Sequence, residues 1–377
     1  MLNAISNRSD YPCLLENNYL NQASLGLIGE AAVSKMHEFL DKTARHGNLK
    51  MSDEEEASFA VPLRKNASKL LNCPIENLAI VSSASEILSQ LPHLFSVKRG
   101  STILVISTDF PAITRPWIAY CQKTDCKLKF IDEHADENLT EKIVKNIDIE
   151  TAAVCVSYVQ FSTGTQLDIK RIRQVASEFG ARLVVDVTQA AGAVPISAND
   201  WQADILVCSG YKWLGGHGGV ALAVISSELL KKVPPSPGWF GGDNPFDMTA
   251  TLLPLSKTAK KYTQATMSYI SIIGLTASIS ELLEIGPQKI FSHSQKMSSL
   301  LRDGLAKSQW TTHRPSQDDS ASSHIITLVN ESVDISQTIQ DLKEQKVFCG
   351  VRNDRLRISL AHYNDESDLN ALLSVLR

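Results

Sequence analysis

Short apolar runs alternate with helical patterns along the middle of the chain, from about residue 78 to residue 225. Each run is too short for a helix, is rich in Val and Ile, and is apolar on both of its faces. This pattern is typical of parallel strands that helices cover on both sides. The predicted strands are residues 78–81, 102–106, 152–156, 182–185, 205–208 and 220–225.

Segments with helical spacing lie between these strands. In residues 168–179, for example, Ile169, Ile172 and Val175 recur on one face. The alternation of strands and helices predicts an α/β fold with a mostly parallel sheet sandwiched by helices. Because ligands of such folds bind at the carboxyl ends of the strands, we expect the chemistry of this protein there.

The pattern changes after residue 233. The cluster PPSPG at 234–238 predicts a loop, and helical stretches follow over 269–283 and 291–305. A strand–helix–strand–helix series then predicts a small α+β unit over 324–329, 335–345, 356–360 and 365–376. Since one core stops growing at about 250–300 residues, we expect three parts. They are an N-terminal arm (1–25), a large α/β domain (26–260), and an interface helix with a small C-terminal α+β domain (261–377).

Composition and charge narrow the choice of partner. The chain has 377 residues, with Lys and Arg totalling 37 against 41 Asp and Glu, and a formal net charge of −4. This balance gives no reason to expect nucleic acid or a membrane surface as partner, so we expect a small molecule. The seven cysteines are scattered without metal-ligand spacing, so no metal site is predicted. Because no signal-peptide or membrane-spanning run is found, we expect a cytoplasmic protein.

Three features at predicted strand ends carry candidate chemistry. Residues 81–86 (VSSASE) run from a strand into a helix through serines, which can form an anion pocket for a phosphate. The alternative is that Ser82 or Ser83 only caps the helix. Asp186 ends a buried apolar strand, where a carboxylate needs a partner; it could instead cap the next helix. Lys212 follows the strand 205–208 and precedes a glycine-rich turn.

A lysine at a surface is the default interpretation of any single lysine. Held between an apolar strand and a glycine-rich turn, however, Lys212 can lose its proton and form a Schiff base. Together the three features describe a pyridoxal 5'-phosphate site, because that cofactor needs an amine for its aldehyde, an acid for its pyridine nitrogen and anchors for its phosphate.

The same residues resemble a known family. The chain is similar to the fold-type I pyridoxal-phosphate enzymes of the class V aminotransferase group, which includes cysteine desulfurases, kynureninases and isopenicillin-N epimerase-like proteins. The similarity runs from residues 19–24 (YLNQAS) to residues 356–364 (LRISLAHYN). It implies that Lys212 forms the Schiff base, that Asp186 bonds the pyridine nitrogen, and that Gln189 lies near the cofactor's phenolic oxygen.

The resemblance implies further roles. Phe110 would stack on the pyridine ring, Thr266 would reach a phosphate across a homodimer interface, Arg357 would hold the substrate's α-carboxylate, and Asn21 would lie beside the substrate. The implied cofactor-binding residues are Ser83, Ala84, Ser85, Phe110, Asp186, Gln189, Ser209, Tyr211, Lys212 and Thr266.

Departures from the family pattern bear on the reaction. Where desulfurases carry two histidines, this chain has Phe110 and Tyr211. Cys349 is the only cysteine near the position of their nucleophile, and its segment is short. Residues 210–212 and 237–240 look more like the kynureninase and epimerase side of the group.

The predicted function is that of an amino-acid enzyme that acts by β or γ elimination or bond cleavage through a quinonoid intermediate. The alternatives are an aminotransferase, a cysteine desulfurase and a non-enzymatic protein on the same fold. We expect a homodimer with shared active sites. The sequence leaves the roles of five residues open. The arginines could contact the substrate or form ordinary ion pairs, and the histidines could be acids or bases or have structural roles. These residues are Arg115, Arg352, His46, His217 and His362.

Overall fold

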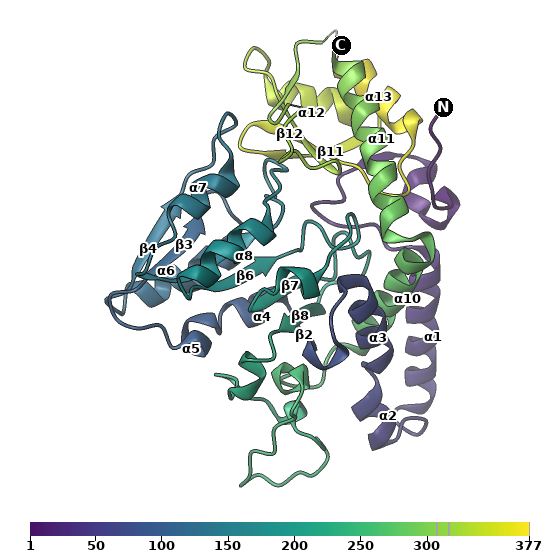
Figure 1. Ribbon diagram of the computed structural model, residues 1–377. Helices are drawn as coiled ribbons and strands as arrows, with labels where there is room; N and C mark the ends of the chain where they lie inside the picture. Colours follow the sequence, from purple (N-terminus) through teal and green to yellow (C-terminus); the bar gives the residue numbers. More distant parts are fainter. Residues whose placement is uncertain (307, 316, 377) are drawn as a thin grey trace.

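A seven-stranded sheet forms the centre of the molecule (Figure 1). The computed structural model describes residues 1–306, 308–315 and 317–376. The strand order is β2-β8-β7-β6-β5-β3-β4. The strands are β2 (Leu78–Val81), β3 (Thr102–Ile106), β4 (Lys127–Ile131), β5 (Thr151–Ser157), β6 (Arg182–Asp186), β7 (Ile205–Ser209) and β8 (Ala221–Ile225).

Strands β3 to β7 are parallel to one another, which confirms the mostly parallel sheet. Strand β8 is antiparallel to both of its neighbours, so the prediction of a parallel strand there was wrong. The reason is the connection from β7, which contains no helix to carry the chain back across the sheet. Strand β4 was missed because it is an edge strand whose Lys127, Lys129 and Phe130 are exposed.

Helices cover both faces of this sheet, because successive strand residues alternate between two apolar clusters. Helices α3, α8 and α10 pack into one cluster, and α4, α5 and α6 pack into the other. The helices of this part are α1 (Glu30–His46), α2 (Asp53–Ser58), α3 (Val61–Leu71), α4 (Ala84–Leu88), α5 (Leu91–Phe95), α6 (Pro111–Cys121), α7 (Leu139–Lys145), α8 (Ile169–Glu178), α9 (Ala198–Trp201) and α10 (Tyr269–Ile285).

A second sheet of five strands lies at the C-terminal end of the molecule, in the order β1-β11-β12-β10-β9. Its apolar face and helices α11 and α13 share one core cluster, in which Leu20, Met297, Leu356 and Leu372 are fully buried. The elements are β1 (Asn18–Leu20), β9 (Thr311–Thr312), β10 (Ile325–Val329), β11 (Val347–Arg352), β12 (Arg355–Ser359), α11 (Pro287–Leu305), α12 (Ile335–Glu344) and α13 (Glu366–Leu376).

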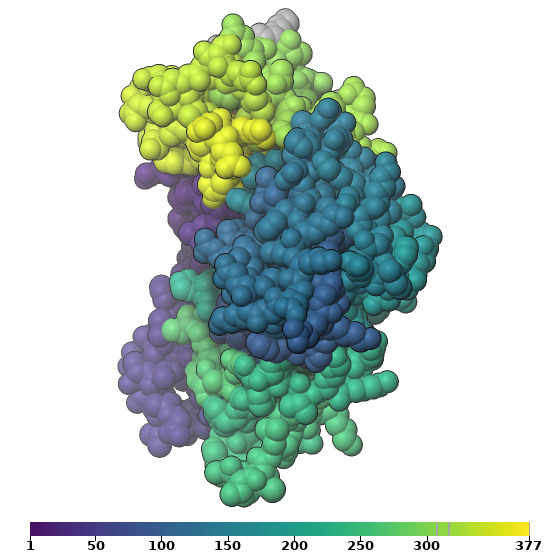
Figure 2. Space-filling model, turned by 90° about the vertical axis from the view of Figure 1, so that its left-hand side faces the viewer, coloured from purple at the N-terminus to yellow at the C-terminus, as the bar shows by residue number. Residues whose placement is uncertain are grey.

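Strand β1 crosses between the parts of the chain, since it pairs in parallel with β11 in the C-terminal sheet. The sequence pattern predicted neither strand. In the space-filling view the yellow C-terminal elements lie above the blue central part, and the green segment that holds the predicted loop lies below it (Figure 2). The domain limits at residues 25 and 260 stay a prediction.

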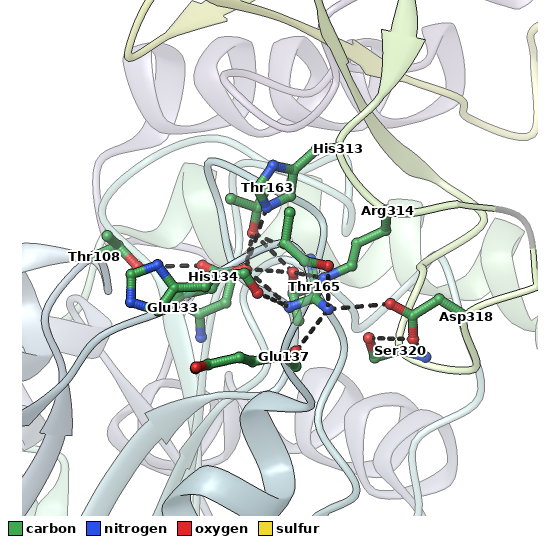
Figure 3. Close-up of polar contacts among 12 residues, drawn as sticks. Thr108, Glu133, His134, Glu137, Thr163, Thr165, His313, Arg314, Asp318 and Ser320 are labelled. Atoms are coloured by element: carbon green, nitrogen blue, oxygen red, sulfur yellow. Dashed lines mark hydrogen bonds and ion pairs between the residues drawn. The ribbon is translucent and has the colours of Figure 1, made fainter.

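A buried polar cluster joins the two sheets (Figure 3). Glu133 follows β4, and its side chain is only 1% exposed. It accepts hydrogen bonds from Thr163 Oγ1 at 2.8 Å, from Thr108 Oγ1 at 3.2 Å and from Thr165. From the C-terminal sheet, His313 Nε2 lies 3.8 Å and Arg314 Nη2 lies 3.9 Å from the Glu133 carboxylate. The cluster therefore holds the end of β9 against the large sheet.

Among the described residues, no single helix is long and apolar enough to cross a membrane. Helices α10 and α11 reach the length and apolar composition of a membrane span only when they are taken together, and they are bent by 74° at their junction.

Candidate active site

One cavity collects the predicted cofactor-binding residues at the carboxyl ends of β5, β6 and β7. Ser157, Asp186 and Ser209 are the last residues of these strands. The cavity has a volume of about 100 Å³. Its lining residues are Ser83, Ala84, Ser85, Phe110, Ala112, Ser157, Phe161, Asp186, Thr188, Gln189, Ser209, Tyr211 and Lys212. Of the predicted cofactor-binding residues, Thr266 is the one that lies elsewhere.

Lys212 projects into this cavity from the turn after β7 and is only 7% exposed. Its Nζ lies 5.1 Å from the centre of the Phe110 ring and 5.8 Å from that of Tyr211. Burial lowers the pKa of the Lys212 amine to about 8; Asp186 opposes this shift, and Arg357 and Arg352 add to it. A neutral amine is therefore available near physiological pH, as attack on an aldehyde requires.

The N-terminal segment fixes the backbone around Lys212. Gln22 Nε2 donates to the Lys212 carbonyl oxygen at 2.9 Å, and the Gly26 amide donates to the Tyr211 carbonyl oxygen, also at 2.9 Å. A Cβ atom on Gly26 would lie 2.0 Å from the Lys212 carbonyl oxygen, so only glycine fits this close approach. The sequence 21–26 thus positions a lysine almost two hundred residues away in the chain.

Asp186 lies at the end of β6 and is only 5% exposed. Its Oδ1 accepts a hydrogen bond from the Thr188 amide at 2.7 Å. Burial raises the pKa of the carboxyl group, while bonding to Thr188 and the charge of Lys212 act against the rise. No helix begins directly after Asp186 in the described chain, where residues 188–190 form a turn, so the alternative of a helix cap is wrong.

Serine hydroxyls line the other end of the cavity. Ser83 also caps α4, since its side chain accepts from the Glu86 amide at 3.2 Å, so this residue both caps the helix and lines the cavity. Because α4 has only five residues, hydroxyl groups must supply most of the binding of an anion here. Ser83, Ser85 and Ser209 all face the cavity and fit a phosphate group.

Asp109 is a buried acid that the sequence pattern did not single out. It accepts hydrogen bonds from the Phe110 amide at 2.7 Å, the Ser157 amide at 2.8 Å and Ser157 Oγ at 2.6 Å. Burial raises its pKa to about 6, against the effect of these bonds. Asp109 therefore fixes the turn that carries Phe110. In the sequence, only its position directly before that aromatic residue indicated such a role.

Gln189 is held on three sides. Its Nε2 donates to the Ala23 carbonyl oxygen at 3.0 Å, and its Oε1 accepts from Trp213 Nε1 at 2.9 Å. The Gln189 carbonyl oxygen lies 2.6 Å from Nε2 of the buried His324, whose pKa burial lowers to about 4. A neutral His324 donates there, so this network fixes the amide at the cavity wall.

The predicted substrate residues lie next to the cavity, behind its lining. Arg357 is fully buried on β12 and donates to the Phe161 carbonyl oxygen at 2.7 Å and to Ser24 Oγ at 2.6 Å. Asn21 reaches the site through Ser24, whose hydroxyl donates to Asn21 Oδ1 at 2.7 Å. Burial, with a contribution from Arg352, lowers the pKa of the Arg357 guanidinium to about 9.

Thr266 lines a separate, largely apolar cavity with Phe59, Phe240 and Tyr269, among other residues. Within one chain it does not meet the serines that face the phosphate end of the active-site cavity. Its contact with a phosphate across a subunit interface stays a prediction.

The residues whose roles the sequence left open lie in different parts of the structure. His362 is buried, its Nδ1 lies 2.9 Å from Ser6 Oγ, and burial lowers its pKa to about 4, which indicates a structural role. His217 is exposed and bonds the neighbouring Gly218 carbonyl oxygen. Arg115 is exposed on α6, and His46 ends α1, outside the lining of the cavity. Arg352 lies beside Arg357.

Comparison with known proteins agrees with this geometry. A family described as aminotransferase class-V matches residues 18–372. An uncharacterized aminotransferase of Bacillus subtilis is 26% identical over 96% of this chain and 94% of its own length. A kynureninase of Bacillus cereus is 25% identical over 81% of this chain and 75% of its own length. The structure of a cysteine desulfurase from Thermococcus onnurineus superimposes with a TM-score of 0.86 at 20% identity, covering 98% of this chain and 96% of that one.

Proposed function

The chain belongs to the aminotransferase class-V family of pyridoxal-phosphate enzymes that act on amino acids, and we propose that it is a lyase. In this proposal it eliminates a group from, or cleaves a bond at, the β or γ carbon of its substrate. The observation that carries the proposal is the setting of Lys212, a buried amine in the same cavity as Asp186, whose pKa is lowered by burial and by the charge of Arg357.

The donor set of the cavity fits pyridoxal phosphate. When bound, pyridoxal phosphate supplies an aldehyde that condenses with amines and a conjugated ring that accepts electrons from the substrate's α carbon. Lys212 would hold the aldehyde carbon, Asp186 would keep the pyridine nitrogen protonated, and Phe110 would cover one ring face. Ser83 and Ser209 would bind phosphate oxygens.

The remaining task of these residues is to orient the substrate and move one proton. Arg357 would hold the α-carboxylate, because a planar guanidinium suits a carboxylate. With the carboxylate fixed, the Lys212 amine in its neutral form would take the α-proton and later return it. The rings of the half-buried Tyr211 and of Phe110, which is 39% exposed, lie beside that amine.

Desulfuration is disfavoured by the state of the one thiol near the substrate arginine. Cys349 lies on β11, and burial raises the pKa of its thiol to about 12. A persulfide-forming cysteine needs a reachable thiolate, and this thiol stays protonated at neutral pH. Transamination keeps support from the relative in Bacillus subtilis, which is described as an aminotransferase.

The test is incubation of the purified holoenzyme with single amino acids. A lyase releases products with no second substrate: ammonia and a 2-oxo acid after elimination, or a shortened amino acid after carbon–carbon cleavage. Turnover that begins only when a 2-oxo acid is added as amino acceptor would establish the aminotransferase instead. Alanine formed from cysteine together with a protein persulfide would establish the desulfurase, because elimination from cysteine releases its sulfur as sulfide with ammonia and a 2-oxo acid.

We also propose a homodimer with shared active sites. Thr266 lies at a largely apolar cavity, and the segment that follows Trp239 exposes large apolar side chains nearby in the chain. Met248, Leu252 and Leu253 are 69%, 66% and 58% exposed. Exposed apolar residues gathered on one segment mark a site of interaction, and a second copy would cover them.

A further inference from the structure

Three arginines lie on one face of the hairpin formed by β11 and β12. In the register of the hairpin Arg352 is opposite Arg355, and Gly350 is opposite Arg357. Directly opposed residues project to the same face, and so do residues two apart on one strand. Like charges placed opposite one another destabilise a hairpin. The arrangement therefore calls for something anionic near this face.

No carboxylate of the described chain lies within ion-pair distance of these three guanidinium groups. Arg355 instead meets Nδ1 of His313 at 3.1 Å. Arg352 and Arg357 both donate to one neutral oxygen, Ser24 Oγ, at 3.2 Å and 2.6 Å. Two cations thus flank a single hydroxyl group, and the Nε atom of the fully buried Arg357 has no hydrogen-bond partner.

The charges of the same two arginines act on the reactive amine, since both lower the pKa of Lys212. Two buried acids lie near the cavity. Asp109 already accepts hydrogen bonds from Ser157 and Phe110, and Asp186 lines the cavity where the pyridine nitrogen of the cofactor would bind. The substrate side is thus rich in positive charge, and none of the described carboxylates pairs with Arg352 or Arg357 there.

Gly350 makes room for this arrangement. A Cβ atom at position 350 would lie 3.2 Å from Arg357 Nε and 3.0 Å from Asn21 Oδ1. The small residue opposite Arg357 thus leaves space for the guanidinium beside Ser24, while the next pair on the same face of the hairpin contains Arg352, which bonds the same hydroxyl group.

We propose that Arg352 determines substrate specificity, and that the substrate is an α-amino acid with a second carboxylate on its side chain. The α-carboxylate binds Arg357 and the side-chain carboxylate binds Arg352, with Ser24 between them. This inference rests on the proposed function, in which Arg357 holds the α-carboxylate. One substrate with two carboxylates supplies a partner for each of the two arginines.

The test compares acids with amides of the same size. Wild-type holoenzyme is titrated with L-aspartate, L-asparagine, L-glutamate and L-glutamine, and the change in visible absorbance of the cofactor gives each dissociation constant. We expect the acid of at least one pair to bind at least 10-fold more tightly than its amide. In Arg352→Gln, binding of that acid should weaken about 10- to 150-fold while binding of the amide changes little.

Two variants complete the design. Arg352→Lys keeps the charge and should retain part of the preference for the acid, which a merely structural role of Arg352 would not predict. Arg99→Gln is the matched control. Arg99 precedes β3, its side chain is 85% exposed, and it pairs with Asp125 at the surface. It should leave all four dissociation constants unchanged.

The outcomes separate this inference from the proposed function. Equal weakening of acid and amide in Arg352→Gln would overturn the role of Arg352 in specificity. Tight binding of neutral amino acids by the wild type, with no preference for either acid, would overturn the substrate class and leave the pyridoxal site intact. Failure of every amino acid to bind or react would refute the proposed function itself.

Discussion

Burial has opposite effects on the reactivity of two nucleophilic side chains near Arg357. It lowers the pKa of the Lys212 amine to about 8 and raises the pKa of the Cys349 thiol to about 12. In both cases the low-polarity surroundings favour the neutral form. For an amine the neutral form is the nucleophile, and for a thiol it is the inert form. One environment thus prepares Lys212 for reaction and leaves Cys349 unreactive.

Lys212 in the cofactor-free protein should react with an amine-specific acylating reagent with a midpoint near pH 8. Exposed lysines should react with a midpoint near 10.4, so they serve as internal references in the same sample. The measurement is the fraction of Lys212 labelled by a short pulse between pH 6 and 11, read by mass spectrometry of peptides. A Lys212 midpoint that coincides with the reference lysines would contradict the lowered pKa.

Cys349→Ala should retain turnover of the true substrate, because a thiol that stays protonated takes no part in the reaction. Arg357→Ala should weaken use of any α-amino acid about 10- to 150-fold, the effect of losing one charge-assisted contact. The measurement is kcat/KM for both variants with the same amino acid. Loss of activity in Cys349→Ala, together with a persulfide on Cys349 of the wild type, would reverse our ranking of lyase over desulfurase.

At the scale of elements, strands that are apolar on both faces could be predicted, and so could the residues at their carboxyl ends. Asp186 and Lys212 stand out because a charged residue follows a buried apolar run. Edge strand β4 could not be predicted, since its exposed lysines break the pattern. The pairing of β1 with β11 joins segments far apart in the chain, and no local pattern encodes such a contact.

The same reasoning explains the site residues that the sequence left out or open. Asp109 looks like any loop aspartate until its bonds to Ser157 are seen. Arg352 looks like a surface arginine until the hairpin register places it beside Arg357 through Ser24. Both depend on tertiary contacts between elements, which local spacing does not determine.

The cluster around Glu133 gives a prediction at this scale. Glu133→Gln should lower the free energy of unfolding at pH 7 by about 1.5–3 kcal/mol, because it removes a buried charged acceptor of several hydrogen bonds. Glu137→Gln is the control, since the Glu137 carboxylate is 47% exposed and pairs with Lys142 at the surface. The measurement is urea denaturation of the wild type and both variants.

The difference between the wild type and Glu133→Gln should depend on pH. Burial alone would raise the pKa of Glu133, but the nearby His313 and the hydrogen bonds from Thr165 and Thr163 outweigh it and lower the pKa. The stabilisation is therefore present above the unfolded-state value of about 4.3 and is lost as the pH falls through the lower folded-state value. A difference that stays constant down to strongly acidic pH would contradict this assignment.

For the whole molecule, the main prediction concerns the dimer. Replacing both Leu252 and Leu253 by Glu should dissociate it, because two carboxylates would be buried without partners at the proposed interface. Sedimentation at micromolar concentration should give a dimer for the wild type and a monomer for the double variant. Replacing the exposed Leu49, which lies in the turn after α1, by Glu is the control and should leave the dimer intact. A fully active wild-type monomer would refute the shared active site.

The pairing of β1 with β11 has a consequence for the order in which the protein assembles on the ribosome. Asn18 lies opposite Val347, so the partner of this strand is synthesised more than 300 residues after it. Chains fold progressively as they emerge, and contacts between distant segments form slowly. The cofactor end of the cavity, built from residues 83–212, can form first, whereas Ser24 meets Arg352 and Arg357 only after the last hairpin has emerged. The nascent chain should therefore acquire its cofactor pocket before it can recognise a substrate.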